Sequence, residues 1–296
     1  MEPVTDIWVN LFTPPALHHL YYDNPELTHV VEWLNLHERV RGHEPDEFIE
    51  VLDASGIDRI VIPSFKMWSY RDHYWMWQLS TEEVQEVIAQ HPTRMFGMEG
   101  IDPRDGLPGL RRLERAVKEF GFIGAHYHSH GFGVAIDDPR MFPYYAKCAE
   151  LDIPIVVQIG HSAELMPSAT GRPILIDMIA IHFPELRFVA AHTGWPWTDE
   201  LVAMAWKHEN VFIGTSGHAP RYWDEKLVAF INGRGRGKVA FGTDFPVVAH
   251  SDAIEQLKVL GLKEKAYTEL MSGAAERIFR FQEKGLAPTA SSLATP

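Results

Sequence analysis

Residues 154–161 read PIVVQIGH, and this stretch decides the fold class of the chain. Most of its side chains are apolar at consecutive positions, which is typical of a strand covered on both faces. The stretch ends in a polar residue, His161. Two further stretches have the same form: RFVAAH ends at His192, and KVAFGTD ends at Asp244. Each therefore predicts a buried parallel strand that ends in a chemically active side chain.

Short apolar runs of this kind alternate with longer amphipathic segments along the chain. Strands are expected at Val4–Asn10, Asp58–Pro63, Arg94–Ile101, Phe122–His128, Pro154–His161, Leu186–His192, Val211–Ser216 and Lys238–Asp244. Helices expected between them include Pro45–Ala54, Thr81–Gln90, Pro108–Glu119, Pro139–Leu151, Ile174–His182 and Thr198–His208. Eight strand–helix repeats within about 250 residues predict an α/β fold of the (β/α)₈ TIM-barrel type.

The spacing of these segments predicts the domain organisation. No linker rich in Pro, Gly or Ser divides the chain, so we expect one domain over residues 1–282 and a flexible C-terminal tail over 283–296. Two connections are long: residues 11–44 after the first strand and 64–79 after the second. Long βα connections lie at the active-site face of a barrel. The second is rich in aromatic residues, which we expect to pack over the barrel mouth or at a subunit interface.

Composition excludes several classes of function. The formal net charge of −13 argues against a nucleic-acid partner, because phosphate binding requires clustered basic residues. The single cysteine, Cys148, excludes an internal disulfide and a thiolate metal cluster. The first ten residues do not resemble a signal peptide, and no apolar run approaches the roughly 20 residues of a membrane span. We therefore expect a cytoplasmic protein that acts on a small molecule and binds no membrane.

Catalytic groups of a (β/α)₈ barrel stand at the C-terminal ends of its strands. A lone histidine at a strand end is more often structural, but three polar strand ends in one barrel favour a shared site. We expect His192 and Asp244 to be catalytic. Imidazole nitrogens and a carboxylate that converge on one axis would bind a divalent ion. His161 and Asp244 are therefore candidate ligands.

The fourth strand contributes two more candidate metal ligands. His126 and His128 alternate within GAHYHSH, so they share one face of the strand. A structural role for this pair is equally compatible with the pattern. His130 lies beyond the strand and is expected to be a loop residue. Asp6, in the first strand, is expected to anchor the barrel floor by accepting backbone hydrogen bonds.

Five residues are candidates for contact with the substrate: Asn10, Trp8, Trp195, Arg221 and His73. Trp8 and Asn10 are two positions apart in the first strand, so their side chains share one face of it. Trp195 follows the sixth strand. Arg221 follows the seventh strand and His73 lies in the aromatic connection, where either could meet an anionic substrate. The alternative is that these two side chains are simply solvated.

The chain resembles the amidohydrolase superfamily, in the branch of aminocarboxymuconate-semialdehyde decarboxylase and resorcylate-type decarboxylases. The matching elements are Asp6, GFIGAHYH at 121–128 in place of G-x-x-G-x-K-x-H, His161, AHTGWPW at 191–197, FGTDFP at 241–246 and GAAERIF at 273–279. The resemblance implies that His161 and Asp244 hold a metal ion. It also implies that His192 orients or deprotonates the metal-bound water or the substrate.

The chain departs from this family at its first strand. The usual D-x-H-x-H is replaced by residues 6–10, DIWVN, so two strong ligands are missing. The indole nitrogen of Trp8 is only a donor, and Asn10 offers a weak carbonyl ligand. Either His126 or His128 compensates, or the metal is weakly held, or the protein works without metal. A divalent ion is expected, with Zn²⁺ first and Mn²⁺ as the alternative.

The first expectation for function is a metal-assisted hydrolase that cleaves an ester, lactone or amide bond of a small carboxylated or cyclic substrate. The second is a non-oxidative decarboxylase of an aromatic or muconate-like acid, which would use the same residues. The third is a metal-free or non-catalytic member of the family. The aromatic connection and the habit of the family are compatible with a homodimer.

Overall fold

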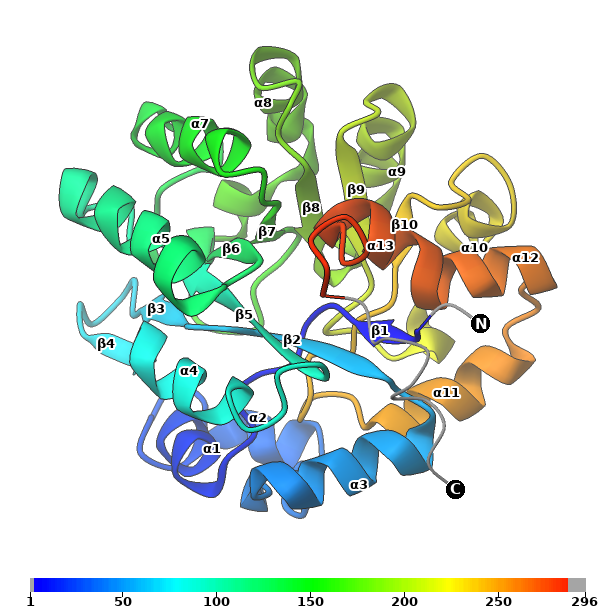
Figure 1. Cartoon of the computed structure of the whole chain (residues 1–296), viewed down its shortest axis with the longest axis horizontal. Helices are drawn as coiled ribbons and strands as arrows, with labels where there is room; N and C mark the ends of the chain where they lie inside the picture. Colours follow the sequence, from blue (N-terminus) through cyan, green and yellow to red (C-terminus); the bar gives the residue numbers. More distant parts are fainter. Residues whose placement is uncertain (1–2, 287–296) are drawn as a thin grey trace.

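Eight parallel strands form the centre of the molecule (Figure 1). The computed structural model describes residues 3–286. The sheet order is β1-β2-β5-β6-β7-β8-β9-β10. Its strands are β1 Thr5–Asp6, β2 Arg59–Pro63, β5 Met95–Gly100, β6 Gly124–Tyr127, β7 Ile155–Gln158, β8 Phe188–Ala191, β9 Val211–Gly214 and β10 Val239–Ala240. Each lies within a predicted strand, and every residue of β2 and β8 is buried, as expected for strands covered on both faces.

Main-chain hydrogen bonds join the first strand to the last. The amide of Ile7 donates to the carbonyl of Phe241 at 3.0 Å, and the amide of Asp244 donates to the carbonyl of Trp8 at 2.9 Å. A parallel bridge pairs Val9 with Phe245. These bonds close the sheet into the predicted TIM barrel.

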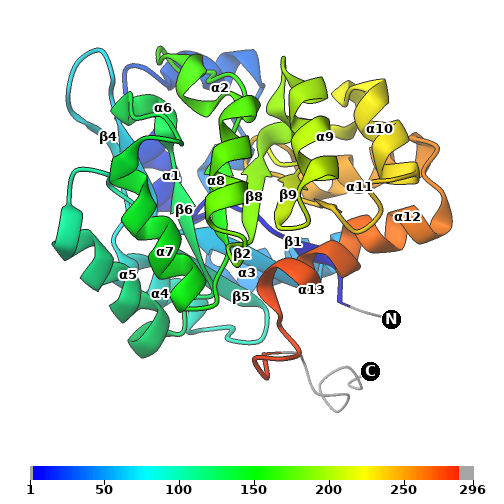
Figure 2. The same cartoon turned by 90° about the horizontal axis from the view of Figure 1, so that it is seen from above.

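Helices form an outer layer around the strands (Figures 1 and 2). They are α1 Pro14–Tyr21, α2 Thr28–Trp33, α3 Pro45–Ser55, α4 Thr81–Ile88, α5 Gly106–Phe120, α6 Ser129–Phe132, α7 Phe142–Glu150, α8 Ile176–His182, α9 Thr198–Lys207, α10 Glu225–Asn232, α11 His250–Val259, α12 Glu264–Thr268 and α13 Ala274–Phe279. All six predicted helices are present, and the one expected at Pro139 begins with a 3₁₀ turn, Pro139–Met141. No helix within residues 3–286 is long and apolar enough to cross a bilayer.

The two long connections have secondary structure of their own. Residues 11–44 contain α1, α2 and a 3₁₀ turn at Arg39–Arg41. Residues 64–79 contain an antiparallel hairpin of β3 Lys66–Trp68 and β4 Trp75–Gln78. Several hairpin side chains are buried, in agreement with the expected packing at the barrel mouth.

Asp6 anchors the barrel floor as expected. Its fully buried carboxylate accepts hydrogen bonds from the amides of Trp8 at 2.9 Å and Thr243 at 3.1 Å. The hydroxyl of Thr243 also donates to it at 2.5 Å, and Nε2 of His250 lies 3.1 Å away. Asp6 therefore ties the first strand to the segment that carries Asp244.

The predicted C-terminal tail begins as a hydrogen-bonded turn. The amide of Leu286 donates to the carbonyl of Phe281 at 2.8 Å, and Nζ of Lys284 donates to the carbonyl of Asp152 at 2.7 Å. The remainder of the tail lies outside the described residues.

Candidate active site

A cavity of about 660 Å³ opens where five of the barrel strands end. The residues that end or follow these strands and line the cavity are Asn10, Gln158, His192, Gly217 and Asp244. The long first connection adds Tyr21, Trp33 and Arg39 to the lining. The volume lies within the range of about 300–1,000 Å³ that is usual for small-molecule sites.

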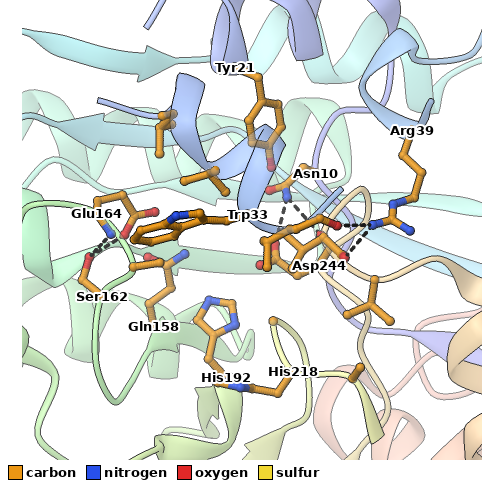
Figure 3. Close-up of a pocket in the computed structure, with 18 of the residues that line it drawn as sticks. Asn10, Tyr21, Trp33, Arg39, Gln158, Ser162, Glu164, His192, His218 and Asp244 are labelled. Atoms are coloured by element: carbon orange, nitrogen blue, oxygen red, sulfur yellow. Dashed lines mark hydrogen bonds between the residues drawn. The ribbon is translucent and has the colours of Figure 1, made fainter. Parts of the chain in front are cut away.

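Asp244 lies deep in this cavity, with part of its surface facing the open space (Figure 3). Its backbone is left-handed, with φ of 60°. Burial raises the pKa of the Asp244 carboxyl well above its usual value, and the negative charge of Glu164 adds to this rise. The amide of Asn10, which donates to Oδ1 of Asp244 at 2.8 Å, opposes the rise. The site therefore favours the neutral, protonated form of Asp244.

His192 follows β8 and lines the same cavity. Its Nδ1 lies 3.1 Å from the hydroxyl of Ser216. A Cβ atom at Gly217, whose φ is +78°, would lie 2.7 Å from that nitrogen, so the close approach requires glycine. Burial lowers the pKa of His192 to about 4, and the imidazole is therefore neutral at physiological pH.

Charged or ionisable groups that the sequence did not single out also line the cavity, among them Arg39, Tyr21 and Glu164. Nε of Arg39 is buried and has no hydrogen-bond partner within residues 3–286. Its NH1 lies 3.9 Å from Asp252, whose carboxylate is 61% exposed. Burial raises the pKa of Tyr21, so its hydroxyl stays protonated, and Figure 3 shows this hydroxyl directed toward Asn10. These groups give the cavity the means to recognise a polar ligand.

Nothing in the sequence pattern pointed to these three residues. Arg39 and Tyr21 lie in the first long connection, where the polar residues resemble a solvated surface. Glu164 lies in a loop beyond β7. His130, expected to be an ordinary loop residue, is buried, lines the cavity and has Nε2 3.0 Å from the carbonyl of Gly160.

Of the five residues predicted to contact the substrate, two line the cavity. Asn10 and Arg221 line the cavity, although Arg221 is exposed. Trp195 is 49% exposed beside the entrance, with its ring 4.8 Å from that of His161. His73 stands in the turn of the hairpin and does not line the cavity. Trp8 is fully buried beneath the cavity and does not line it either.

The predicted metal ligands are not gathered around one point. His161 lines the cavity but is exposed, whereas His126 and His128 are buried and outside the lining. The ring of Trp8 lies between histidines, 4.6 Å from His126 and 5.1 Å from His192. No three His, Cys, Asp or Glu side chains of the described chain are placed to hold a metal ion. This donor set does not fit the expected Zn²⁺ or Mn²⁺ site.

The fold is that of a TIM-barrel protein, with a cavity of small-molecule size at the C-terminal ends of its strands. A protein-family model named Amidohydrolase matches residues 33–281. The chain belongs to this family, as its strand-end motifs indicated.

Two curated relatives are decarboxylases. The chain is 22% identical to 2-amino-3-carboxymuconate-6-semialdehyde decarboxylase of Dictyostelium discoideum, over 69% of this chain and 67% of the relative. It is also 22% identical to gamma-resorcylate decarboxylase of a Polaromonas species, over 67% of this chain and 74% of the relative.

Solved structures share the fold. An uncharacterised TIM-barrel protein from Bordetella bronchiseptica has a TM-score of 0.73 at 21% identity, covering 93% of this chain and 98% of its own. A dihydroxybenzoic acid decarboxylase from Polaromonas, with bound manganese and the inhibitor 2-nitroresorcinol, has a TM-score of 0.68 at 17% identity and covers both chains fully, 100% each. A probable 2-pyrone-4,6-dicarboxylic acid hydrolase from Acinetobacter baumannii has a TM-score of 0.60 at 14% identity, covering 94% and 99%.

Proposed function

We propose that the protein is a non-oxidative decarboxylase of a small aromatic or conjugated carboxylic acid. This was the alternative to the hydrolase expected first. The observation that carries the proposal is the elevated pKa of Asp244, which favours a neutral acid at the base of the cavity. A neutral carboxylic acid can protonate a carbon atom, whereas the activation of water for hydrolysis requires a base. The two curated decarboxylases support the same choice.

In the proposed reaction, Asp244 transfers its proton to the carbon that carries the substrate carboxylate. A C–H bond forms, and the C–C bond to the carboxylate then breaks. Its electron pair returns to the ring or conjugated system, and the carboxylate leaves as CO₂. Asp244 remains as a carboxylate and regains a proton from water. The neutral His192 contributes a polar wall without adding charge.

No step in this proposal uses a metal ion, because no three His, Cys, Asp or Glu side chains within residues 3–286 are gathered to hold one. A dihydroxybenzoic acid decarboxylase of similar fold contains bound manganese, not zinc. The homodimer and the cytoplasmic location likewise remain predictions from the sequence.

Arg39 is proposed to bind the substrate carboxylate. Its guanidinium lies in the cavity wall, and its side chain is 25% exposed. NH2 donates to the carbonyls of Leu34 at 3.2 Å and Val247 at 3.4 Å, whereas NH1 lies 3.9 Å from Asp252, which is beyond hydrogen-bond distance. A guanidinium binds a carboxylate through parallel hydrogen bonds that are stronger than neutral ones.

We expect Arg39→Met to raise KM about 10- to 100-fold, because a charge-assisted hydrogen bond is worth about 1.5–3 kcal/mol. Steady-state kinetics on an identified acid would measure this change. Arg234→Met is the control, since Arg234 packs against Trp206 and lies outside the cavity lining. Equal KM values for the two variants would remove Arg39 from the binding site.

The pH dependence follows from the same acid. Asp244 must be protonated to react, so we expect kcat to fall as the pH rises through its elevated pKa. His192 gains a proton only near its pKa of about 4, so the rate should stay level between these two pH values. A kcat profile from pH 4 to 10 would measure this dependence. A rate that rises with pH over this range would instead indicate a general base, as hydrolysis requires.

The reaction class is tested by product analysis. The purified protein is incubated in D₂O with a panel of hydroxylated aromatic acids and with a cyclic lactone acid. A decarboxylase releases CO₂ and places deuterium on the carbon that lost the carboxylate. Formation of a ring-opened acid without CO₂ would support the hydrolase instead.

A further inference from the structure

The cavity has opposite charges at its two ends. Figure 3 shows Arg39 at one end and Glu164 at the other, with Trp33, Asn10 and Asp244 between them in this view. All five residues line the same cavity. A ligand that spans this space meets a cation at one end and an anion at the other.

Glu164 is available to accept a hydrogen bond from a ligand. Its carboxylate accepts a hydrogen bond from the hydroxyl of Ser162, and no Lys, Arg or His within residues 3–286 forms an ion pair with it. Its charge acts on the cavity groups: it raises the pKa of both Tyr21 and Asp244. An unpaired carboxylate beside a binding space is stabilised by a ligand N–H or O–H.

Trp33 supplies an apolar surface between these charged ends. Its side chain lines the cavity but is 72% exposed. Its ring contacts that of His29, at 4.6 Å between centroids in an edge-on arrangement. A flat ring placed in the cavity would cover part of the exposed indole, and offset or edge-on aromatic contacts of this kind are favourable.

We infer that the cavity takes a planar acid with its carboxylate toward Arg39 and a hydrogen-bond donor, a phenolic hydroxyl or an amino group, toward Glu164. This inference rests on the proposed function and specifies its substrate class. Because Figure 3 shows Arg39 and Glu164 at opposite ends of the site, the inferred single-ring ligand carries its donor para to the carboxylate.

The arrangement also has a chemical consequence. Protonation of the carboxylate-bearing carbon by Asp244 is assisted by an electron-donating group para to it. While the C–H bond forms, the phenolic proton moves onto Glu164 and the ring becomes a quinoid. When CO₂ leaves, the C–C electron pair restores the aromatic ring and the proton returns from Glu164 to the oxygen. Glu164 then ends each cycle as it began.

The test compares the binding of two ligands of similar size, 4-hydroxybenzoate and 4-methylbenzoate, by calorimetry. The unsubstituted protein should bind the hydroxy acid about 10- to 100-fold more tightly, as expected for a hydrogen bond to a charged group. Glu164→Leu should remove this preference while leaving the affinity for 4-methylbenzoate unchanged within a few-fold. Glu185→Leu, at an exposed position outside the cavity, is the matched control and should retain the preference.

The outcomes separate this inference from the proposed function. An equal affinity for both ligands, a preference that survives Glu164→Leu, or no binding of either acid would overturn the inference. If the preference follows Glu164 but no hydroxylated acid releases CO₂, the recognition stands and the decarboxylase proposal fails. If CO₂ is released without the preference, the decarboxylase stands and the role of Glu164 fails.

Discussion

Asp244→Asn is expected to reduce turnover by about a thousandfold, within the range that positioned general acids contribute. The asparagine amide cannot transfer a proton to carbon. The variant should still fold, because asparagine tolerates the left-handed backbone at this position, where φ is 60°. Its side-chain oxygen can still accept the hydrogen bond that Asn10 donates to Asp244. Single-turnover assays, with circular dichroism as a check of folding, would measure the effect.

The control for this substitution is Asp23→Asn. Asp23 is 54% exposed and lies outside the cavity lining, so its replacement should leave the rate unchanged. A folded Asp244→Asn protein with a rate within a few-fold of the original would exclude Asp244 as the acid.

Trp8→Ala is expected to lower the free energy of unfolding by about 3–5 kcal/mol, the usual cost of removing a large buried aromatic side chain. Trp8 is fully buried and its ring contacts Phe65, His126 and His192. Its indole N–H also acts on Asp244, where it opposes the rise of the carboxyl pKa, so the loss combines packing with this polar contact. Urea unfolding followed by fluorescence would measure the change.

Trp206→Ala is the matched control for this prediction. Trp206 is 61% exposed on α9, and its replacement should change stability by less than about 0.5 kcal/mol. If both variants unfold at the same urea concentration, Trp8 does not contribute the packing inferred here.

The barrel could be predicted because its strands carry a strong local signal. Runs such as RIVIP and RFVAA are apolar at consecutive positions, and each became a buried strand. The short helices α1 and α2, which lie in the first long connection, were not predicted. The hairpin of β3 and β4 was read as a loop because its aromatic residues alternate over only three and four positions.

The candidate site could be predicted only where it lies on the strands. His192 and Asp244 follow strands directly, and both line the cavity. The two-residue spacing of His126 and His128 predicted that they share one face of the strand. It could not reveal that the Trp8 ring packs against His126. Arg39 and Glu164 depend on how long loops fold over the barrel, which local patterns do not determine.

The hydrogen bond between Asn10 and Asp244 joins residues that are 234 positions apart in the chain. Contacts of such long sequence separation form late, because the entropy of the intervening chain must be lost before they contribute. During synthesis, the first strand must wait for nearly the whole polypeptide before it gains its last neighbour. A truncated product that lacks the segment around Asp244 would leave the edges of β1 and β9 without their partners, and such unpaired edges favour aggregation.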